Sequence, residues 1–376
     1  MTGVLELKIN FTLWDLLLSG GTRVIFELAN RLQDRGHEVT ITSLKKRDVS
    51  WFPLKAEVRC VERSIFPRTI DYGFRRMGLD VKIDFIELLA KSIPDCDVNV
   101  GTFYPTAFAV YRSEKGIPFY YAQHYEPLIT TDPYERSLAG EIYYLPLNVV
   151  TVSTWIKDAI YRDFAKETTV VLNGVNLDVF HPREVKRDSE DKIVLCRPSN
   201  IWWKGFYDLI EAMKIVYKAR SDVQLAMFTA ERLLFRKFPF PVKMLSSPSD
   251  KDVAKLYSSC DVFVSSSWYE GFHMPPLEAM ACGAPVVTTD CGGGVSDYAK
   301  DRFNALVVPS RNPNALANAI LKVLSDESLA KTLGKNGTTT AKQFTWDKTV
   351  SEIEELFRKA LKSTLVLTDR TLGVPI

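Results

Sequence analysis

The stretch that decides the fold is WYEGFHMPPLEAMACGAPVV, residues 268–287. It directly follows DVFVSSS, a short apolar run typical of a buried strand in a parallel sheet. Pro275 and Pro276 suit the start of a helix, where a missing N–H group costs little, and Gly283 suits its end. The stretch therefore predicts a loop and a helix at the carboxyl end of a strand, where doubly wound sheets bind their ligands.

Short apolar strands and amphipathic helices alternate on both sides of this stretch. Near the start, VLELKINF at residues 4–11 precedes a glycine-containing loop, a helix-like segment and the strand VTITS. The alternation pauses over residues 167–192, which hold an Asn-Gly turn, a proline and a charged cluster, and restarts with KIVLCRPS. This pattern predicts an α/β protein with two doubly wound, Rossmann-like domains.

The predicted boundaries follow from where the alternation pauses. We expect a first domain over residues 1–165, a linker over 166–183 and a second domain over 184–345. Residues 346–376 form a C-terminal helix, which we expect to pack back on the first domain, and a tail.

Composition excludes several classes of protein. The 376 residues suffice for two domains, and 46% hydrophobic with 25% charged residues is typical of a globular protein. The 48 basic and 46 acidic residues give a net charge of only +2, so no nucleic-acid partner is predicted. No apolar run is long enough to span a membrane, and Glu6 and Lys8 fall where a signal peptide would be apolar. We therefore expect a cytoplasmic protein.

Neither a metal ion nor another cofactor is predicted. The six cysteines lie far apart, without the spacing of a zinc site or of a disulfide framework. Asp95-Cys96-Asp97 has the D-x-D spacing of some metal sites, but it precedes a predicted strand and so lies at the wrong end of the sheet. We interpret this motif as structural.

Two carboxylates, Glu270 and Glu278, lie within the stretch at residues 268–287. Taken alone, Glu278 is an acidic residue in the first turn of a helix, where the helix dipole favours it, and Glu270 is a solvated loop residue. Together with Gly271, which permits close backbone approach, and with the N–H groups of a helix N-terminus, they favour a site for an anionic or hydroxyl-rich ligand.

The same stretch resembles the signature of the retaining glycosyltransferases of family four, which carry the glycosyl transferases group 1 domain. That resemblance implies the GT-B fold, in which two Rossmann-like domains face each other across a cleft. It extends over nearly the whole chain, with further motifs in family order: SGGTRVIFELANRLQDRGHEVTI at residues 19–41, VSTWIKDAI at 152–160, LNGVNLDVFHP at 172–182, KGFYDLIEAM at 204–213 and FTWDKTV at 344–350.

The family resemblance implies that the first domain binds the acceptor and that the second domain binds the nucleotide-sugar donor. Glu278 is similar to the glutamate that hydrogen-bonds the nucleotide ribose, and Glu270 to the one beside the donor sugar. The backbone N–H groups of Gly271, Phe272 and His273 are then expected to approach the sugar and the diphosphate.

Further roles are implied for a basic pair and for three residues of the first domain. Arg197 and Lys204 resemble the pair that neutralises the leaving diphosphate, Gly20 and Gly21 the glycine loop that faces it, and His124 the histidine on the sugar side. Each also has an ordinary structural explanation: a sheet-end arginine, a helix-entrance lysine, a turn into a helix and a core histidine.

The chain departs from the family pattern in four places. His273 stands where glycine is usual, Asp297 stands where glutamate is commoner, and the spacing of Arg197 and Lys204 is two residues longer. The strand within VQLAMFTAERL lacks the usual glycine-rich end. We expect these departures to affect the choice of donor.

We therefore expect a metal-independent, retaining transfer of a sugar from a nucleotide-diphosphate sugar to a hydroxyl acceptor, in polysaccharide or glycoconjugate biosynthesis. The acceptor is a glycan, a lipid-linked molecule or a small molecule. Residues 64–77 mix arginines with aromatic residues, which suits either a peripheral contact with the inner membrane face or a solvated loop. The alternatives are a nucleotide-sugar epimerase or phosphorylase of the same fold, and a non-catalytic sugar-binding subunit.

Overall fold

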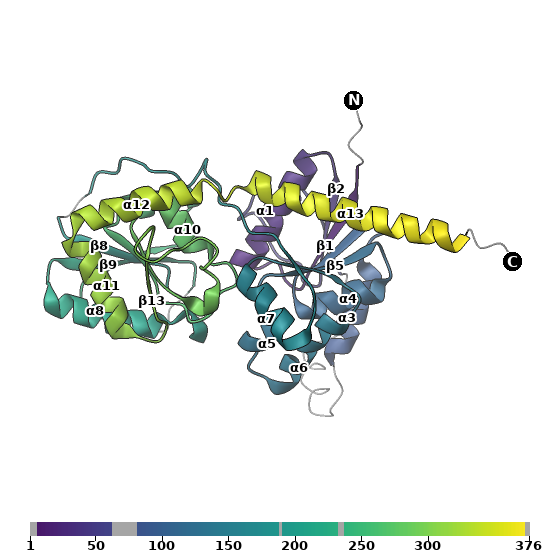
Figure 1. Ribbon diagram of the computed structural model, residues 1–376, viewed down its shortest axis with the longest axis horizontal. Coiled ribbons are helices and arrows are strands. Elements are labelled where there is room, and N and C mark those ends of the chain that lie inside the picture. Colours follow the sequence, from purple (N-terminus) through teal and green to yellow (C-terminus); the bar gives the residue numbers. More distant parts are fainter. Residues whose placement is uncertain (1–5, 62–80, 188–189, 232–236, 373–376) are drawn as a thin grey trace. The chain divides into compact units, whose positions relative to one another are not determined.

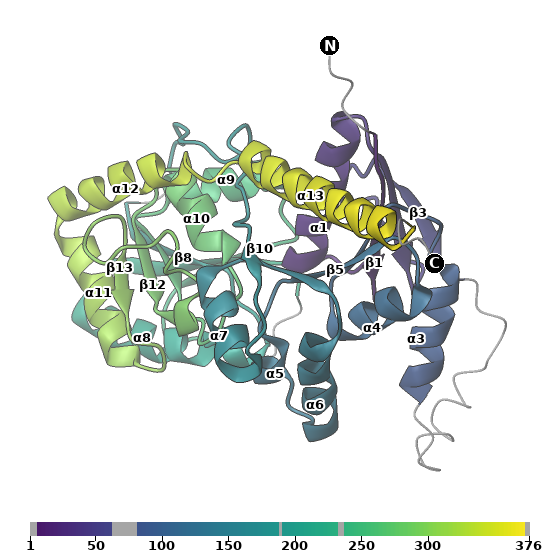
Figure 2. The ribbon, with the colours of Figure 1, turned by 45° about the vertical axis from the view of Figure 1, so that its right-hand side comes forward.

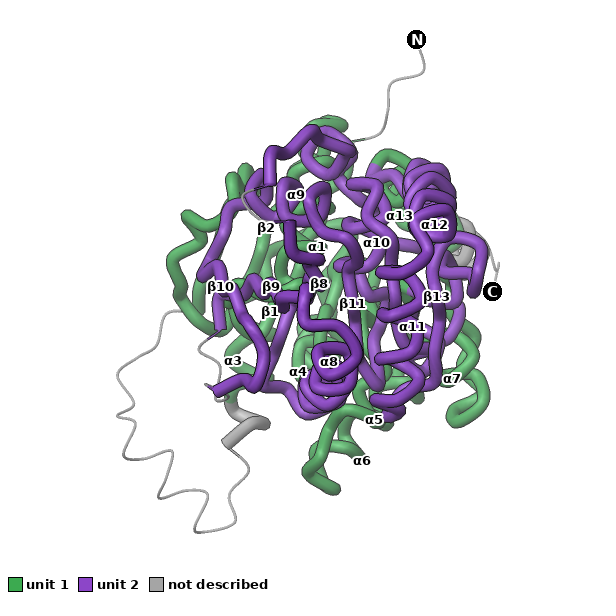
Figure 3. The backbone as a smooth tube through the Cα atoms, turned by 90° about the vertical axis from the view of Figure 1, so that its left-hand side faces the viewer, with its two compact units in different colours: residues 1–152, 156–171, 347–376 green, residues 153–155, 172–346 purple. Residues whose placement is uncertain are grey.

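The structure is a computed structural model that describes residues 6–61, 81–187, 190–231 and 237–372. The chain divides into two compact units (Figures 1 and 3). We call Met1–Val152, Ile156–Val171 and Asp347–Ile376 the N-terminal unit, and Ser153–Trp155 and Leu172–Trp346 the C-terminal unit.

The described part of the N-terminal unit contains a seven-stranded sheet in the order β3-β2-β1-β4-β5-β6-β7. All its strand pairs are parallel. The inner strands are buried on both faces, as the apolar runs of the sequence predict. The strands are β1 (Lys8–Leu13), β2 (Glu38–Ser43), β3 (Glu57–Cys60), β4 (Val98–Gly101), β5 (Ile117–Ala122), β6 (Asn148–Thr151) and β7 (Thr169–Val170).

Helices connect these parallel strands and cover the sheet. Helix α1 begins at Gly20, where the Ser19 hydroxyl caps it by accepting a hydrogen bond of 3.1 Å from the Thr22 N–H. The helical segments are α1 (Gly20–Asp34), α3 (Val81–Ser92), α4 (Tyr104–Ser113), α5 (Glu126–Ile129), α6 (Pro133–Glu141), the 3-10 helix η1 (Ile142–Tyr144) and α7 (Thr154–Phe164).

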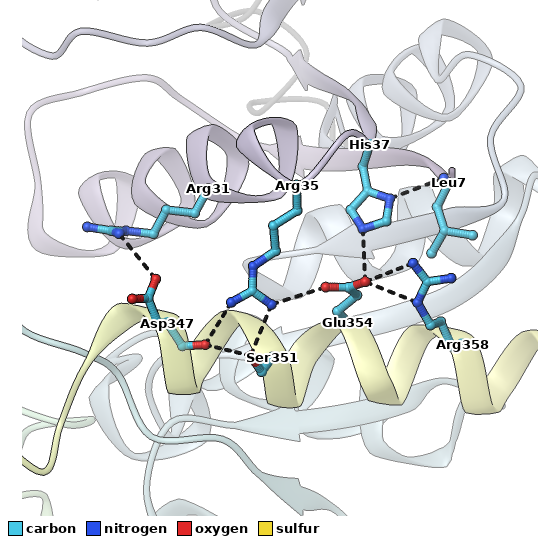
Figure 4. Close-up of polar contacts among 8 residues, drawn as sticks. All are labelled: Leu7, Arg31, Arg35, His37, Asp347, Ser351, Glu354 and Arg358. Atoms are coloured by element: carbon cyan, nitrogen blue, oxygen red, sulfur yellow. Dashed lines mark hydrogen bonds and ion pairs between the residues drawn. The ribbon is translucent and has the colours of Figure 1, made fainter. Parts of the chain in front are cut away.

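The last helix of the chain, α13 (Trp346–Leu372), runs beside α1 in the N-terminal unit (Figures 1 and 2). Glu354 of α13 accepts hydrogen bonds from Arg35, at 3.1 Å, and from Arg358, at 2.7 Å (Figure 4). On the apolar side, Phe357 packs edge-on against Phe119 of β5 with ring centroids 4.9 Å apart. The helix thus completes a core whose sheet was formed by the first half of the chain.

His37 lies in the same network and is buried. Its Nδ1 accepts a hydrogen bond of 3.2 Å from the Leu7 N–H, so the proton of the neutral ring is on Nε2, which faces Glu354 at 3.4 Å (Figure 4). Burial lowers the pKa of His37 below its ordinary value and so favours this neutral form. The residue therefore contributes to the docking of α13.

The C-terminal unit repeats the architecture with six strands in its described part, in the order β10-β9-β8-β11-β12-β13. These pairs are also all parallel. The strands are β8 (Lys192–Cys196), β9 (Val223–Thr229), β10 (Val242–Ser246), β11 (Val262–Ser265), β12 (Val286–Thr289) and β13 (Leu306–Val308). The predicted pair of doubly wound domains is thereby confirmed.

In the C-terminal unit, α8 packs against α11, and α10 packs against α9 and α12. Their apolar faces and the strands form one core, which includes Val194, Leu225, Val264 and Ile320. The helical segments are η2 (Trp202–Lys204), α8 (Phe206–Ala219), α9 (Asp250–Ser259), α10 (Met274–Ala281), η3 (Cys291–Gly293), α11 (Pro313–Ser325) and α12 (Glu327–Ala341).

The strand order places the carboxyl ends of β8 and β11 side by side at the point where the chain reverses its direction across the sheet. Doubly wound sheets bind ligands at such a switch point, because the loops leaving the two strands diverge there. The loop after β8 carries Arg197 and Lys204, and the loop after β11 carries Glu270. The fold therefore brings together residues that are far apart in the sequence.

Two other sequence predictions concern the first half of the chain: a structural role for Asp95-Cys96-Asp97 and a membrane contact. The Asp97 carboxylate accepts a hydrogen bond of 2.7 Å from the Lys8 N–H, and Asp95 lies 3.4 Å from the ammonium group of Lys115. Residues 64–77, for which a membrane contact was considered, lie outside the described residues. Among the helices that the structure describes, none is long and apolar enough to cross a membrane.

Candidate active site

The centre of the candidate site is an ion pair between Lys204 and Glu270. The Lys204 ammonium lies 2.8 Å from each of the two carboxylate oxygens. Ser267 adds a third hydrogen bond, of 2.7 Å, from its hydroxyl to Oε1. The Glu270 side chain is only 4% exposed, whereas that of Lys204 is 27% exposed. The carboxylate is thus held on both oxygens, and the ammonium group stays within reach of solvent or a ligand.

His273 completes this cluster from the N-terminus of α10. Its Nδ1 lies 3.1 Å from Glu270 Oε1, and its Nε2 lies 2.6 Å from the Ser265 hydroxyl. The backbone of His273 is left-handed, with φ of +69°, and its carbonyl accepts a hydrogen bond of 2.6 Å from the buried Tyr298 hydroxyl. Because glycine adopts this conformation without steric cost, the structure explains why glycine suits the position. The imidazole turns inward toward the carboxylate.

These contacts fix the charge of Glu270. Burial alone would raise the pKa of its carboxyl group, but the charges of His273 and Lys204 and the hydrogen bonds from Lys204 and Ser267 outweigh burial and lower the pKa to about 2. Glu270 is therefore ionised throughout the physiological range, so it is unsuited to act as a general acid. It provides a fixed negative charge beside a lysine.

Glu278 lies in a second group, together with Tyr257 of α9. The Tyr257 hydroxyl donates a hydrogen bond of 3.3 Å to Glu278 Oε2. Burial, and then the charge of Glu278, raise the pKa of Tyr257 well above its ordinary value, whereas the nearby charge of Arg197 lowers it. Arg197, which is exposed, therefore lies close enough to this pair to act on it.

One local prediction about Glu278 was wrong. The sequence placed this residue in the first helical turn, but α10 begins at Met274 and has no acidic residue in its first turn. Pro275 and Pro276 are thus the second and third helical residues. The helix dipole at the first turn consequently does not account for Glu278, and its hydrogen bond with Tyr257 is the local reason for its position.

The predicted residues of the N-terminal unit lie at the carboxyl ends of β1 and β5. Gly20 and Gly21 are the first residues of α1, and His124 is in the loop after β5. A Cβ atom on Gly21 would lie 3.2 Å from the side-chain oxygen of Gln123, whereas one on Gly20 would meet nothing within 4 Å. Gly21 therefore packs against the loop that carries His124, and Gly20 is open to a ligand.

Two departures from the family pattern are connected in the structure. Glu231 follows β9, where glycines were expected, and its carboxylate accepts hydrogen bonds from the Ser199 hydroxyl at 2.9 and 3.0 Å. It also accepts one of 3.1 Å from the Asn200 N–H. The lengthened segment between Arg197 and Lys204 is thus anchored by the residue that replaces the glycine-rich end.

The sequence analysis missed four residues that shape this site: Ser265, Ser267, Glu231 and Tyr257. The two serines were detectable in principle, since a run of three serines at the end of an apolar strand places hydroxyl groups at a ligand-binding edge. Glu231 and Tyr257 carried no such signal, because their partners come from distant segments.

Comparison with known proteins follows the division of the chain. Residues 18–179 match the family model described as Glycosyltransferase Family 4, and residues 180–340 match the one described as Glycosyl transferases group 1. An uncharacterised glycosyltransferase of Methanocaldococcus jannaschii is 29% identical over 214 residues. This alignment covers 56% of the chain and 59% of the relative, so the chain spans less than two thirds of the relative's length.

Two solved structures are similar over nearly their full length. Sucrose-phosphate synthase from Thermosynechococcus elongatus has a TM-score of 0.79 at 18% identity, over 95% of this chain and 99% of its own. The Anabaena protein HepE, solved with UDP and glucose, has a TM-score of 0.75 at 17% identity, over 94% and 100%. At such identities the similarity establishes the fold, and the expected GT-B fold is confirmed.

Proposed function

Since the chain belongs to the glycosyltransferases described by these two family models, we propose that it is a retaining enzyme that moves a sugar from a nucleotide-diphosphate sugar to a hydroxyl acceptor. The observation that carries this proposal is the cluster of Lys204, Glu270 and His273 at the switch point of the C-terminal sheet. It offers a fixed negative charge for sugar hydroxyls and a partly exposed cation for a diphosphate.

The roles follow from position and charge. Glu278, oriented by Tyr257, accepts hydrogen bonds from the ribose hydroxyls. Arg197 and the backbone N–H groups of Gly271, Phe272 and His273, in the loop before α10, bind the diphosphate, and Lys204 donates its remaining hydrogen bond to it. A UDP-sugar is the donor that we favour, because the structurally similar HepE was solved with UDP and glucose.

How Glu270 is held supports the retaining route that we propose. A double displacement needs a carboxylate free to attack the anomeric carbon, but both oxygens of Glu270 are engaged by Lys204 and its side chain is 4% exposed. We therefore propose substitution on the front face. The bond from the anomeric carbon to the diphosphate breaks, the acceptor oxygen bonds to the same face, and the acceptor proton passes to the leaving diphosphate. No metal ion is required, because Arg197 and Lys204 supply the positive charge.

Stereochemistry tests this function. With an α-linked UDP-sugar, proton NMR of the first-formed product is expected to show an α-anomeric coupling. The bond to the diphosphate breaks and the bond to the acceptor forms on the same face of the sugar. The rate in excess EDTA is expected to equal the rate without it. A β-anomeric product would refute the mechanism, and loss of activity that manganese restores would refute metal independence. The absence of transfer from any UDP, GDP, dTDP or ADP sugar would refute the function itself.

Replacing Glu278 by Ala is expected to weaken UDP binding about tenfold to a hundredfold, while turnover at saturating donor stays nearly constant. A hydrogen bond to a charged group contributes about 1.5–3 kcal/mol, and a ribose contact is the same in ground and transition states. Calorimetric titration with UDP measures the effect. Glu211→Ala is the matched control, because its carboxylate forms an exposed surface pair with Lys214. Equal UDP affinities in the two variants would contradict the assignment.

The proposed acceptor is a glycan, a lipid-linked molecule or a small molecule, since each of these presents a hydroxyl group. A cytoplasmic location and a peripheral contact at the inner membrane face through residues 64–77 stay predictions of the sequence. Assays of glycan and lipid-linked acceptors with a UDP-sugar, the donor favoured above, would identify the acceptor.

A further inference from the structure

An aromatic cluster borders the Lys204–Glu270 pair in the C-terminal unit. Trp202 lies two residues before Lys204 in η2 and is 44% exposed. Its ring meets that of Trp268 at a centroid distance of 5.8 Å and that of Tyr269 at 6.2 Å, both edge to face. Because Tyr269 directly precedes Glu270, the cluster adjoins the candidate active site on both loops that form it.

An exposed cation belongs to the same cluster. The guanidinium carbon of Arg311 lies 4.5 Å from the centroid of Trp268 and 5.6 Å from that of Tyr269. One of its nitrogens donates a hydrogen bond of 2.9 Å to the Tyr269 hydroxyl. A guanidinium group has five N–H donors, so donors are left beside the aromatic rings. The cluster thus combines apolar ring surface with hydrogen-bond donors.

Several hydrogen bonds hold these rings in place. The indole nitrogen of Trp268 donates to Asp208 at 2.6 Å, and its backbone N–H donates to the Trp203 carbonyl at 2.7 Å. At the other end of the Trp202 loop, Glu231 binds Ser199 and its neighbour, as described above. A surface fixed before binding loses little conformational entropy when a ligand arrives.

We propose that Trp202, Tyr269 and Arg311 form a carbohydrate-binding platform that holds a sugar ring of the acceptor. The C–H groups on one face of a pyranose are apolar and stack on an indole, while hydroxyl groups at the ring edge accept hydrogen bonds from the guanidinium. The inference rests on the proposed function and names the acceptor class of the same site. It predicts a glycan or the glycan part of a glycoconjugate.

A membrane surface is the other partner that an exposed tryptophan fits, and the cluster is less suited to it. Membrane insertion needs a broad apolar face, usually along a helix of several turns. Trp202 instead lies in a three-residue 3-10 helix, and Lys204 and Arg311 lie close by. The large apolar neighbours in the loop are Ile201, which is 40% exposed, and Trp203, whose ring centroid lies 5.4 Å from that of Trp202. One aromatic ring face with hydrogen-bond donors beside it fits a sugar better than a membrane surface.

Saturation-transfer NMR on the full-length protein tests the platform directly. The probes are disaccharides of glucose, mannose, galactose and N-acetylglucosamine. At least one is expected to receive saturation from the protein, and its dissociation constant is expected to rise about threefold to tenfold in Trp202→Ala. Trp202→Phe, which keeps a stacking surface, is expected to restore much of the affinity. Phe303→Ala removes a side chain that is 50% exposed in the same unit and is expected to change nothing.

Two results would overturn the platform: no disaccharide bound by the wild-type protein, or equal binding by wild type and Trp202→Ala. Binding to phosphatidylglycerol vesicles that depends on Trp202, without disaccharide binding, would assign the surface to a membrane instead. Titration of the same samples with UDP separates the two proposals. UDP binding without disaccharide binding refutes the platform alone, and Trp202-dependent disaccharide binding without any transfer activity refutes the enzyme function alone.

Discussion

Replacing Lys204 by Met is expected to lower the free energy of unfolding by about 3 kcal/mol and sugar transfer by at least about a hundredfold. Glu270 is 4% exposed, and its two oxygens lose the ammonium group that lies 2.8 Å from each. A buried charge left without its partner is among the most destabilising changes known in proteins. Urea denaturation followed by tryptophan fluorescence measures the stability, and initial rates at saturating donor measure the transfer.

Two further variants decide whether the pair itself is responsible. In Lys204→Met combined with Glu270→Gln, the buried charge is gone, so most of the lost stability is expected to return while transfer stays low. Lys214→Met removes a lysine from an exposed pair with Glu211 and is expected to change stability by less than about 1 kcal/mol. If Lys204→Met were no more destabilising than Lys214→Met, the ion pair would not hold the site together.

Acid provides an independent measure of the same interaction. The pKa of Glu270 is lowered to about 2, so its contribution is fully present above the ordinary glutamate value of 4.5 and is lost as pH falls toward 2. Integrated over that window, the contribution is about 3 kcal/mol. The Glu270→Gln protein is expected to lose correspondingly less stability than wild type between pH 4.5 and 2.

The sequence identified Glu270 and Lys204 but assigned them separate partners, the sugar and the diphosphate. The structure shows in addition that they form an ion pair with each other. They are 66 positions apart, and their meeting depends on β8 and β11 being neighbours in the sheet. Alternation of strands and helices predicts two such sheets, yet it does not determine which loops approach to within hydrogen-bond distance.

His273 shows a second limit of sequence reasoning. His273 replaces the usual glycine, and this departure was expected to affect the choice of donor. In the structure the left-handed backbone, with φ of +69°, turns the imidazole toward Glu270 and Ser265. A side chain's direction follows from φ and ψ, which local sequence constrains weakly outside glycine and proline.

Asp297 is another of the four departures from the family pattern, and its hydrogen bonds explain what an aspartate does at this position. Its carboxylate accepts a hydrogen bond of 2.9 Å from the Thr154 N–H and one of 2.6 Å from the Thr154 hydroxyl. Both atoms belong to Thr154, which lies in the short Ser153–Trp155 segment of the C-terminal unit, so the aspartate anchors that segment within the unit although the two residues are 143 positions apart. The sequence marked Asp297 only as a departure from the family pattern, because its partner comes from a segment with no visible link to it.

Replacing Gly205 by Ala is expected to be the most damaging single methyl addition at this site. Gly205 follows Lys204 directly, has φ of +61° and precedes α8. A Cβ atom there would lie 2.0 Å from the Ser266 carbonyl oxygen, which is backbone and has no rotamer to change. Left-handed alanine costs about 1 kcal/mol and overpacking about 1–3 kcal/mol more, so we expect a loss of about 3 kcal/mol.

The relief of that clash determines the effect on activity. Either Lys204 or the segment of Ser266 and Ser267 must move, and both bind the Glu270 carboxylate. A displacement of about 1 Å in such a cluster lowers turnover about a hundredfold. Gly283→Ala is the matched control, since Gly283 has φ of +81° but its added Cβ would find its nearest neighbour at 3.6 Å. That variant bears the backbone cost alone, about 1 kcal/mol. Equal thermal stabilities of the two variants would contradict this prediction. They would show that the backbone between Lys204 and Ser266 moves without loss of stability, and that the site does not depend on the close approach of these two segments.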